Sequence, residues 1–248
     1  MPTVDQIVRR QMQRWELEAR ARAESGAPGR QGQPFPFVTI SRDHGSGGQV
    51  IAEKLAERLG WTCLNRQVVD YVAAHTQVRA QLIELLDEHT RGHLETWIRS
   101  HVMGKYLNET DYARHLASVI RAVICQDPAV ILGRGGAYML AGERQYGLHV
   151  RVVAPFEYRV LRIAETQSLS KEEARARILS VDHDREEFLR SVFHRNGKDP
   201  LDYDLLINTA YIGLDDSVSL LLRALEARRI VAPRSLARLR RTPITVAK

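Results

Sequence analysis

The sequence has no uninterrupted apolar run approaching the roughly 20 residues that a membrane-spanning helix needs. Its first two dozen residues also lack the apolar stretch of a secretory signal peptide, and we therefore expect a cytoplasmic protein. It has only two cysteines, Cys63 and Cys125, with no CxxC pair and no dense Cys/His tract. Neither a disulfide framework nor a zinc site is indicated, and both cysteines are expected to be small buried side chains.

Charge is present but unevenly distributed. Of the 248 residues 44% are hydrophobic and 27% are charged, which is enough apolar material for one sizeable core. The net charge is +6, yet residues 223–248 alone carry seven Arg and one Lys against one Glu, which leaves residues 1–222 at −1. We therefore expect no specific nucleic-acid binding from the core. The basic tail could contact nucleic acid or an anionic membrane, or could simply be solvated.

Hydrophobic periodicity and turn-forming residues divide the chain into four parts. Apolar residues at helical spacing predict an amphipathic helix over 1–24, which could dock within the chain or make a homodimer contact. The glycine- and proline-rich segment 25–34 predicts a flexible linker. Residues 35–232 then form the main domain, and 233–248 form the basic tail.

Short β-branched segments alternate with helical ones in the main domain. The predicted strands are 37–41, 62–64, 129–133, 148–153 and 204–208. The predicted helices are 51–59, 112–126, 158–166, 171–179 and 215–230, with a helical insert over 77–110. This alternation predicts an α/β fold in which a doubly wound, five-stranded parallel sheet is covered by helices on both faces.

A glycine loop, Gly45-Ser46-Gly47-Gly48, follows the first strand and opens a helix. Free backbone N–H groups at a helix N-terminus, together with the positive end of the helix dipole, favour a phosphate. We expect this phosphate site to extend over residues 45–50, which includes Gln49 and Val50. A plain tight turn is the other interpretation of these residues.

The loop lacks three residues of the Walker A pattern, and the first of them is its opening glycine, where this chain has Arg42. Gly48 stands where that pattern has a lysine for the β- and γ-phosphates, and Gln49 stands where it has a Ser or Thr for Mg²⁺. Arg42, at the end of the first strand, could supply the missing cation, or could merely pair with an acid such as Asp43.

The segment Ile40-Ser-Arg-Asp-His-Gly-Ser-Gly-Gly48, followed by Ile51-Ala52, resembles the opening of the cytidylate kinase-like family, a branch of the P-loop nucleoside monophosphate (NMP) kinases. The resemblance covers roughly residues 37–226, and further ordered matches occur at 64–69, 130–136, 150–163, Asp182, Arg185 and 202–209. It implies a P-loop NMP kinase fold, ATP and Mg²⁺ as cofactors, and a lid over 165–200. Members of the family share the lysine-poor loop, which favours Arg42 as the substitute cation.

The resemblance also implies roles for arginines. Phosphoryl transfer needs cations around the transferring group and a lid that excludes water. Arg42, Arg159, Arg162 and Arg185 are the candidate catalytic cations, and Asp182 and Arg185 belong to the lid. The alternative for the lid arginines is a solvated face of ion pairs with nearby glutamates.

The acceptor would lie near Asn65, Arg66 and Arg134, which follow the second and third strands. Relatives have an acid before the arginine after strand two, whereas Asn65 keeps an acceptor oxygen but loses the charge. Asp43 could hold Mg²⁺ directly or through water, or could cap a turn.

The sequence thus predicts ATP-dependent phosphoryl transfer to an NMP, with nucleotides as the binding partners. The alternative is a non-catalytic nucleotide-binding regulatory module with a degenerate Walker A loop. The sequence leaves open which NMP is the acceptor.

Overall fold

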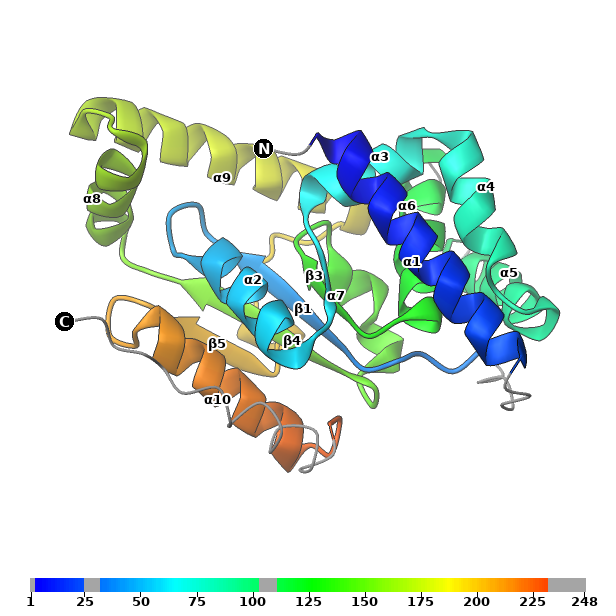
Figure 1. Cartoon of the computed structure of the whole chain (residues 1–248). Helices are drawn as coiled ribbons and strands as arrows, with labels where there is room; N and C mark the ends of the chain where they lie inside the picture. Colours follow the sequence, from blue (N-terminus) through cyan, green and yellow to red (C-terminus); the bar gives the residue numbers. More distant parts are fainter. Residues whose placement is uncertain (1–2, 25–31, 103–110, 232–248) are drawn as a thin grey trace.

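Five strands form one parallel sheet in the computed structural model, which describes residues 3–24, 32–102 and 111–231. The strands are β1 (Phe37–Arg42), β2 (Thr62–Leu64), β3 (Ala129–Leu132), β4 (Gly147–Val153) and β5 (Leu205–Asn208). They lie in the order β2-β3-β1-β4-β5 (Figure 1). The predicted five-stranded parallel sheet is confirmed, and each predicted strand end lies within one residue of the observed one.

Helices cover both faces of the sheet (Figure 1). They are α1 (Val4–Glu24), α2 (Gly48–Leu59), α3 (Arg66–Ala74), α4 (Thr76–Glu84), α5 (Glu88–Val102), α6 (Asp111–Gln126), α7 (Gly136–Met139), α8 (Phe156–Gln167), α9 (Lys171–Phe193) and α10 (Leu214–Ala227), with short 3-10 turns η1 (Ala141–Glu143) and η2 (Pro200–Asp202). In the three described ranges no helix is both long and apolar enough to cross a membrane.

Alternation along the central strand β1 separates two cores. Phe37 is buried with residues of α1, α3 and α6, whereas Val38 and Ile40 are buried with residues of α2 and α10. This is the pleat of a strand covered on both faces, because successive side chains point to opposite sides. Because β1, β3 and β4 are parallel, their carboxyl ends lie at the same edge of the sheet, which is where open α/β sheets bind ligands.

The N-terminal helix α1 docks within the chain. Its Val8, Met12 and Trp15 are buried in the same core as residues of α3, and Arg14 pairs with Asp127 just after α6. The apolar stripe that the sequence left open to docking or to a homodimer is therefore occupied by the chain's own core.

Part of the predicted flexible linker is packed. The N–H of Gly32 donates to Oγ1 of Thr90 at 3.2 Å, and the Gly32 carbonyl accepts from Nη2 of the buried Arg121 at 3.0 Å. Residues 25–31 of that linker lie outside the described residues.

The predicted helical insert, 77–110, falls on α4 and α5 as far as residue 102. Its last part, 103–110, and the basic tail, 233–248, lie outside the described residues.

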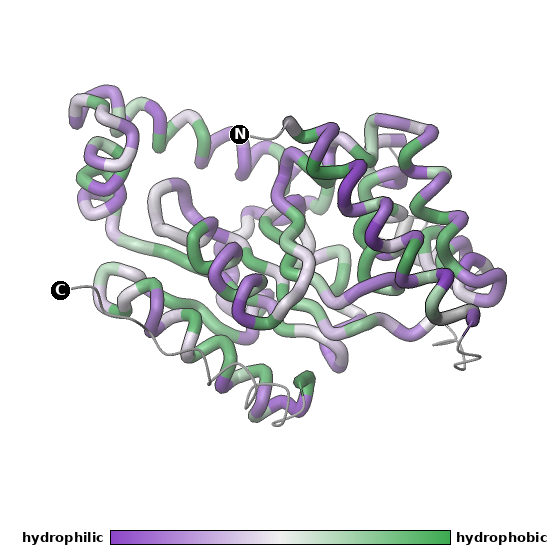
Figure 2. The backbone as a smooth tube through the Cα atoms, in the orientation of Figure 1, coloured by the Kyte–Doolittle hydropathy of each residue, from purple (hydrophilic) through white to green (hydrophobic). Residues whose placement is uncertain are grey.

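One helix is much longer than predicted. The sequence predicts that a helix ends at Leu179 and that Arg185 follows it, whereas α9 continues without a break to Phe193. In Figure 2 hydrophilic and hydrophobic residues alternate along α9, and the charged residues after Leu179 conceal the apolar spacing. Asp182 and Arg185 consequently lie one turn apart on a single rigid helix.

Both ends of α9 are fixed. At its start the Ser170 side chain accepts from the Glu173 N–H and the Glu173 side chain accepts from the Ser170 N–H, which is a capping box. At its end Val192 and Phe193 are buried in the core that α3 and α6 share. The region predicted as a lid, 165–200, is thus built on a helix that is anchored in the main domain.

Candidate functional site

The loop between β1 and α2 has the backbone geometry of an anion site. Gly45 and Gly47 have φ of 83° and 82°, in the left-handed region that glycine adopts without strain. A Cβ on Gly47 would lie 2.7 Å from Cδ2 of Leu214, so no larger residue fits there. The N–H groups of Gly48, Gln49 and Val50 form the first turn of α2 and have no partner within the helix.

The side chains of the loop do not face a ligand. Ser46 is fully buried, and its hydroxyl donates to the carbonyls of Asp43 and Val152 at 2.9 and 3.1 Å. The side chain of Gln49 donates to Glu53, one turn along α2, and not to the loop. The loop therefore offers peptide N–H groups alone, as the sequence predicts for a chain without the Walker lysine.

Arg162 of α8 lies beside Gly47, the residue at the N-cap of α2. A Cβ on Gly47 would lie 2.9 Å from Nη1 of Arg162, which places the guanidinium at the N-terminus of α2. A cation is unfavourable at this end of a helix, whereas an anion is favourable. Arg162 forms no ion pair with any carboxylate in the described ranges, so an anion between Arg162 and the loop would satisfy both.

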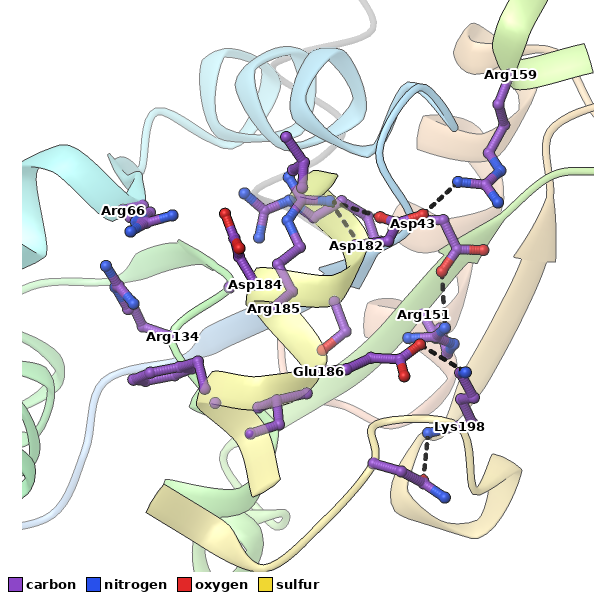
Figure 3. Close-up of a pocket in the computed structure, with 18 residues that line it drawn as sticks. Asp43, Arg66, Arg134, Arg151, Arg159, Asp182, Asp184, Arg185, Glu186 and Lys198 are labelled. Atoms are coloured by element: carbon purple, nitrogen blue, oxygen red, sulfur yellow. Dashed lines mark hydrogen bonds and ion pairs between the residues drawn. The ribbon is translucent and has the colours of Figure 1, made fainter. Parts of the chain in front are cut away.

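A cavity of about 490 Å³ lies beside the loop, between the carboxyl ends of the strands and α9 (Figure 3). The lining includes seven cations and four carboxylates, an excess of three positive charges: Arg42, Arg66, Arg134, Arg151, Arg159, Arg185, Lys198, Asp43, Asp182, Asp184 and Glu186. Such a surplus in a partly enclosed space attracts an anionic ligand.

Arg42 is the least compensated of these cations. Its side chain fills the space beside Gly133 at the end of β3, and it makes no ion pair within the described residues. Burial is the main cause that lowers its pKa from 12.5 to about 9, and the neighbouring guanidiniums of Arg185, Arg134 and Arg66 contribute the rest. The sequence predicts Arg42 near the donor phosphates, but its guanidinium points toward the arginines expected at the acceptor.

Arg66 and Arg134, predicted at the acceptor, share the carboxylate of Asp70 in α3. Arg134 has φ of 53°, uncommon for a residue other than glycine, and its guanidinium lies 4.7 Å from the ring centre of Phe188 in α9. Its buried Nε has no partner. Arg134 lines the cavity, and it combines backbone strain with an unsatisfied donor, two features that are common at ligand sites.

Asn65 lies differently from its predicted role at the acceptor. Its side-chain oxygen accepts from the Val68 N–H at 3.0 Å and caps α3. That oxygen is therefore occupied by the helix.

Asp43 does not fit a preformed Mg²⁺ ligand. Its carboxylate accepts from Nη2 of Arg151 at 2.7 Å, and burial raises its pKa, which the Arg151 charge partly offsets. The three described ranges contain no group of three His, Cys, Asp or Glu side chains able to hold a metal. The protein residues thus do not provide a metal cage.

The lid residues contact the start of the loop. Arg159 is 9% exposed and donates to the carbonyls of Ala154 and His44, and to Asp182. Arg185 donates to the Arg42 carbonyl at 3.2 Å, and burial lowers its pKa. Three of the four predicted catalytic arginines, Arg42, Arg159 and Arg185, thus line one cavity, with Arg159 already bonded to protein atoms. Arg162 lies apart from them, beside Gly47.

Sequence reasoning missed several residues of the site. Arg151 lies near the carboxyl end of β4, where a charged residue could have been recognised as facing the ligand edge. Asp70, Phe188 and Lys198 reach the site only through the packing of α3, α9 and the chain after α9, for which the sequence offers no signal.

Comparison with known proteins identifies one family. The sequence model of the cytidylate kinase-like family matches residues 37–211, well over half of the chain. An uncharacterized protein from Eubacterium ventriosum has a similar fold, with 17% identity over 77% of this chain and 99% of that chain, at a TM-score of 0.55. A shikimate kinase from Bacteroides thetaiotaomicron covers 77% of this chain and 98% of its own, with 11% identity and a TM-score of 0.42.

A uronate isomerase from Corynebacterium glutamicum is 34% identical over 94 residues, which are 38% of this chain and 18% of that protein. The chain thus spans under a fifth of the length of this curated relative.

Proposed function

This chain belongs to the cytidylate kinase-like family, and from that premise we propose that it transfers a phosphoryl group from ATP to a nucleoside monophosphate. The observation that carries the proposal is the position of Arg42. Its partly buried guanidinium has no carboxylate partner among the described residues, and it lines a cavity with surplus positive charge that lies beside a loop of peptide N–H groups. Two anions held at these two places would bring a donor and an acceptor phosphate together.

The donor phosphates would bind the N–H groups of Gly45 and of residues 47–50, with Arg162 over them. The acceptor phosphate would lie in the cavity near Arg66 and Arg134, and Arg42 would lie between the two. An acceptor phosphate oxygen then attacks the γ-phosphorus, the bond to the β-phosphate oxygen breaks, and ADP and a nucleoside diphosphate form. No general base is required because the acceptor phosphate is already ionised, so catalysis consists of positioning and charge stabilisation.

ATP and Mg²⁺ are part of the proposal. Because Asp43 is paired with Arg151, we expect no Mg²⁺ binding by the protein before the nucleotide is present.

A panel of NMPs incubated with ATP and Mg²⁺ tests the proposal, with nucleoside diphosphate measured by chromatography. We expect one NMP to yield product and Arg42→Met to abolish it, while Arg58→Met on the far end of α2 leaves it unchanged. If folded, ATP-binding protein forms no nucleoside diphosphate from any NMP, the kinase proposal is wrong.

A non-catalytic nucleotide-binding module is the second candidate. The residues that favour it are Gly48 and Gln49 in place of the Walker residues, together with the paired Asp43. It predicts that ATP raises the melting temperature without product, because a ligand stabilises by mass action whether or not it reacts.

A further inference from the structure

His44, the residue before the glycine loop, is held through both of its backbone groups by side chains of α9 and α8. Oδ1 of Asp182 accepts from the His44 N–H at 2.7 Å, and Nη1 of Arg159 donates to the His44 carbonyl at 3.0 Å. Figure 3 shows Asp182 and Arg159 reaching the loop from α9 and α8. The His44 N–H is thus not available to a phosphate, and the anion site begins at Gly45.

One carboxylate organises these contacts. Oδ2 of Asp182 accepts from Arg159 at 2.5 Å, while Oδ1 lies 3.6 Å from Nη1 of Arg185. Arg185 in turn donates to the Arg42 carbonyl. The side chain of Asp182 is 23% exposed and that of Arg159 is 11% exposed, so water competes little for these charge-assisted hydrogen bonds.

The loop needs this support because its glycines can adopt many backbone conformations. Gly45 and Gly47 both adopt left-handed conformations, and glycine has the largest backbone freedom to lose. The direction of the N–H groups after Gly45 depends on the orientation of the peptide before it. A phosphate site requires these N–H donors to be held in place within a fraction of an ångström. Hydrogen-bond partners outside the loop provide that restraint.

We propose that Asp182 is a positioning residue for the donor site: its carboxylate fixes the His44 peptide from α9 and so orients the N–H groups of the phosphate loop. Asp182 touches no reacting atom in this role. Its own negative charge is offset by Arg159 and Arg185, so it does not repel the phosphates. The expected effect on ATP binding rests on the proposed function, whereas the positioning of the His44 backbone does not.

Two measurements on the full chain test it. The first is hydrogen exchange of backbone amides in the ligand-free protein, followed by NMR. In Asp182→Ala we expect the amides of His44 and Ser46, which donate to Asp182 and to the Asp43 carbonyl, to exchange at least about tenfold faster, while β1 and the rest of α2 keep their protection. This part holds whether or not the protein is a kinase.

The second measurement is ATP binding by calorimetry. We expect Asp182→Ala to bind ATP about tenfold more weakly, which is the scale of one charge-assisted hydrogen bond. Asp182→Asn keeps an oxygen for the His44 N–H and should restore binding to within about threefold of the wild type. Glu187→Ala, which removes an exposed carboxylate from the same helix, is the matched control and should change neither measurement.

The outcomes separate the two claims. Unchanged exchange at His44 in folded Asp182→Ala overturns the positioning role, whatever the protein binds. Faster exchange in a protein whose wild type binds no ATP leaves the positioning role standing and removes the proposed function. If Asp182→Asn behaves like Asp182→Ala in both measurements, charge balance rather than the hydrogen bond holds the loop, and the proposal is also wrong.

Discussion

Replacing Arg42 by methionine should make the ligand-free protein more stable, although it should abolish the proposed activity. Arg42 is a cation that burial and three neighbouring guanidiniums disfavour, with a pKa lowered from 12.5 to about 9. At 1.36 kcal/mol per pKa unit, the charged form is destabilised by at most about 5 kcal/mol. Methionine keeps an unbranched stem beside Gly133 and removes the charge.

The net gain will be smaller than that limit, because the guanidinium also makes packing contacts that methionine loses. Exchanging buried charged groups for apolar ones of similar volume stabilises proteins by about 1–4 kcal/mol. We expect Arg42→Met to raise the free energy of unfolding by about 1–3 kcal/mol, with a rise in melting temperature of about 2–4 °C for each kcal/mol.

Urea denaturation in a buffer free of phosphate and sulfate measures this gain. Arg66→Met is the control, since that exposed arginine is already paired with Asp70 and should give no gain. Adding sulfate should then reduce the difference in unfolding free energy between the variant and the wild type: at ten times its Kd, a bound anion stabilises the wild type by about 1.4 kcal/mol and the variant hardly at all. A loss of stability in Arg42→Met without anions would refute the argument that the charge of Arg42 is uncompensated until an anion binds.

Three further perturbations follow from the structure. Gly47→Ala forces a left-handed alanine against Leu214 and should cost about 1–2 kcal/mol of stability and abolish the rise in melting temperature with ATP, as differential scanning calorimetry would show. Arg162→Ala should weaken ATP binding about tenfold while leaving the free energy of unfolding without ATP unchanged or higher; equal ATP affinity in calorimetry would contradict its place over the loop. Burial lowers the pKa of His149 to about 4, so the unfolded chain takes up a proton near pH 6.5 that the folded chain refuses, and stability should fall between pH 6.5 and 4 by up to about 3 kcal/mol. Urea midpoints at pH 7 and 4.5 should differ less in His149→Gln than in the wild type.

The sheet could be predicted because its signal is local. Each strand is a short β-branched segment bounded by turn residues, and β2 falls on the predicted residues 62–64. The end of α9 could not be predicted in the same way. The contacts that hold its last turn come from Val192 and Phe193 in a core built from α3 and α6, which are distant in the sequence.

The direction of the Arg42 side chain could not be predicted from the sequence. Its place after β1 and before the glycine loop made it the natural candidate for the missing lysine. Its side chain instead extends over Gly133, about ninety residues later, where the absence of a Cβ leaves room for a guanidinium.

Arg162, from α8, reaches the loop that Arg42 leaves. The cation over the donor loop and the cation toward the acceptor are therefore two different arginines. One consequence can be separated experimentally: loss of Arg162 should affect nucleotide binding by the loop, whereas loss of Arg42 should affect anion binding in the cavity. A single substitute for the Walker lysine would instead make the two losses indistinguishable.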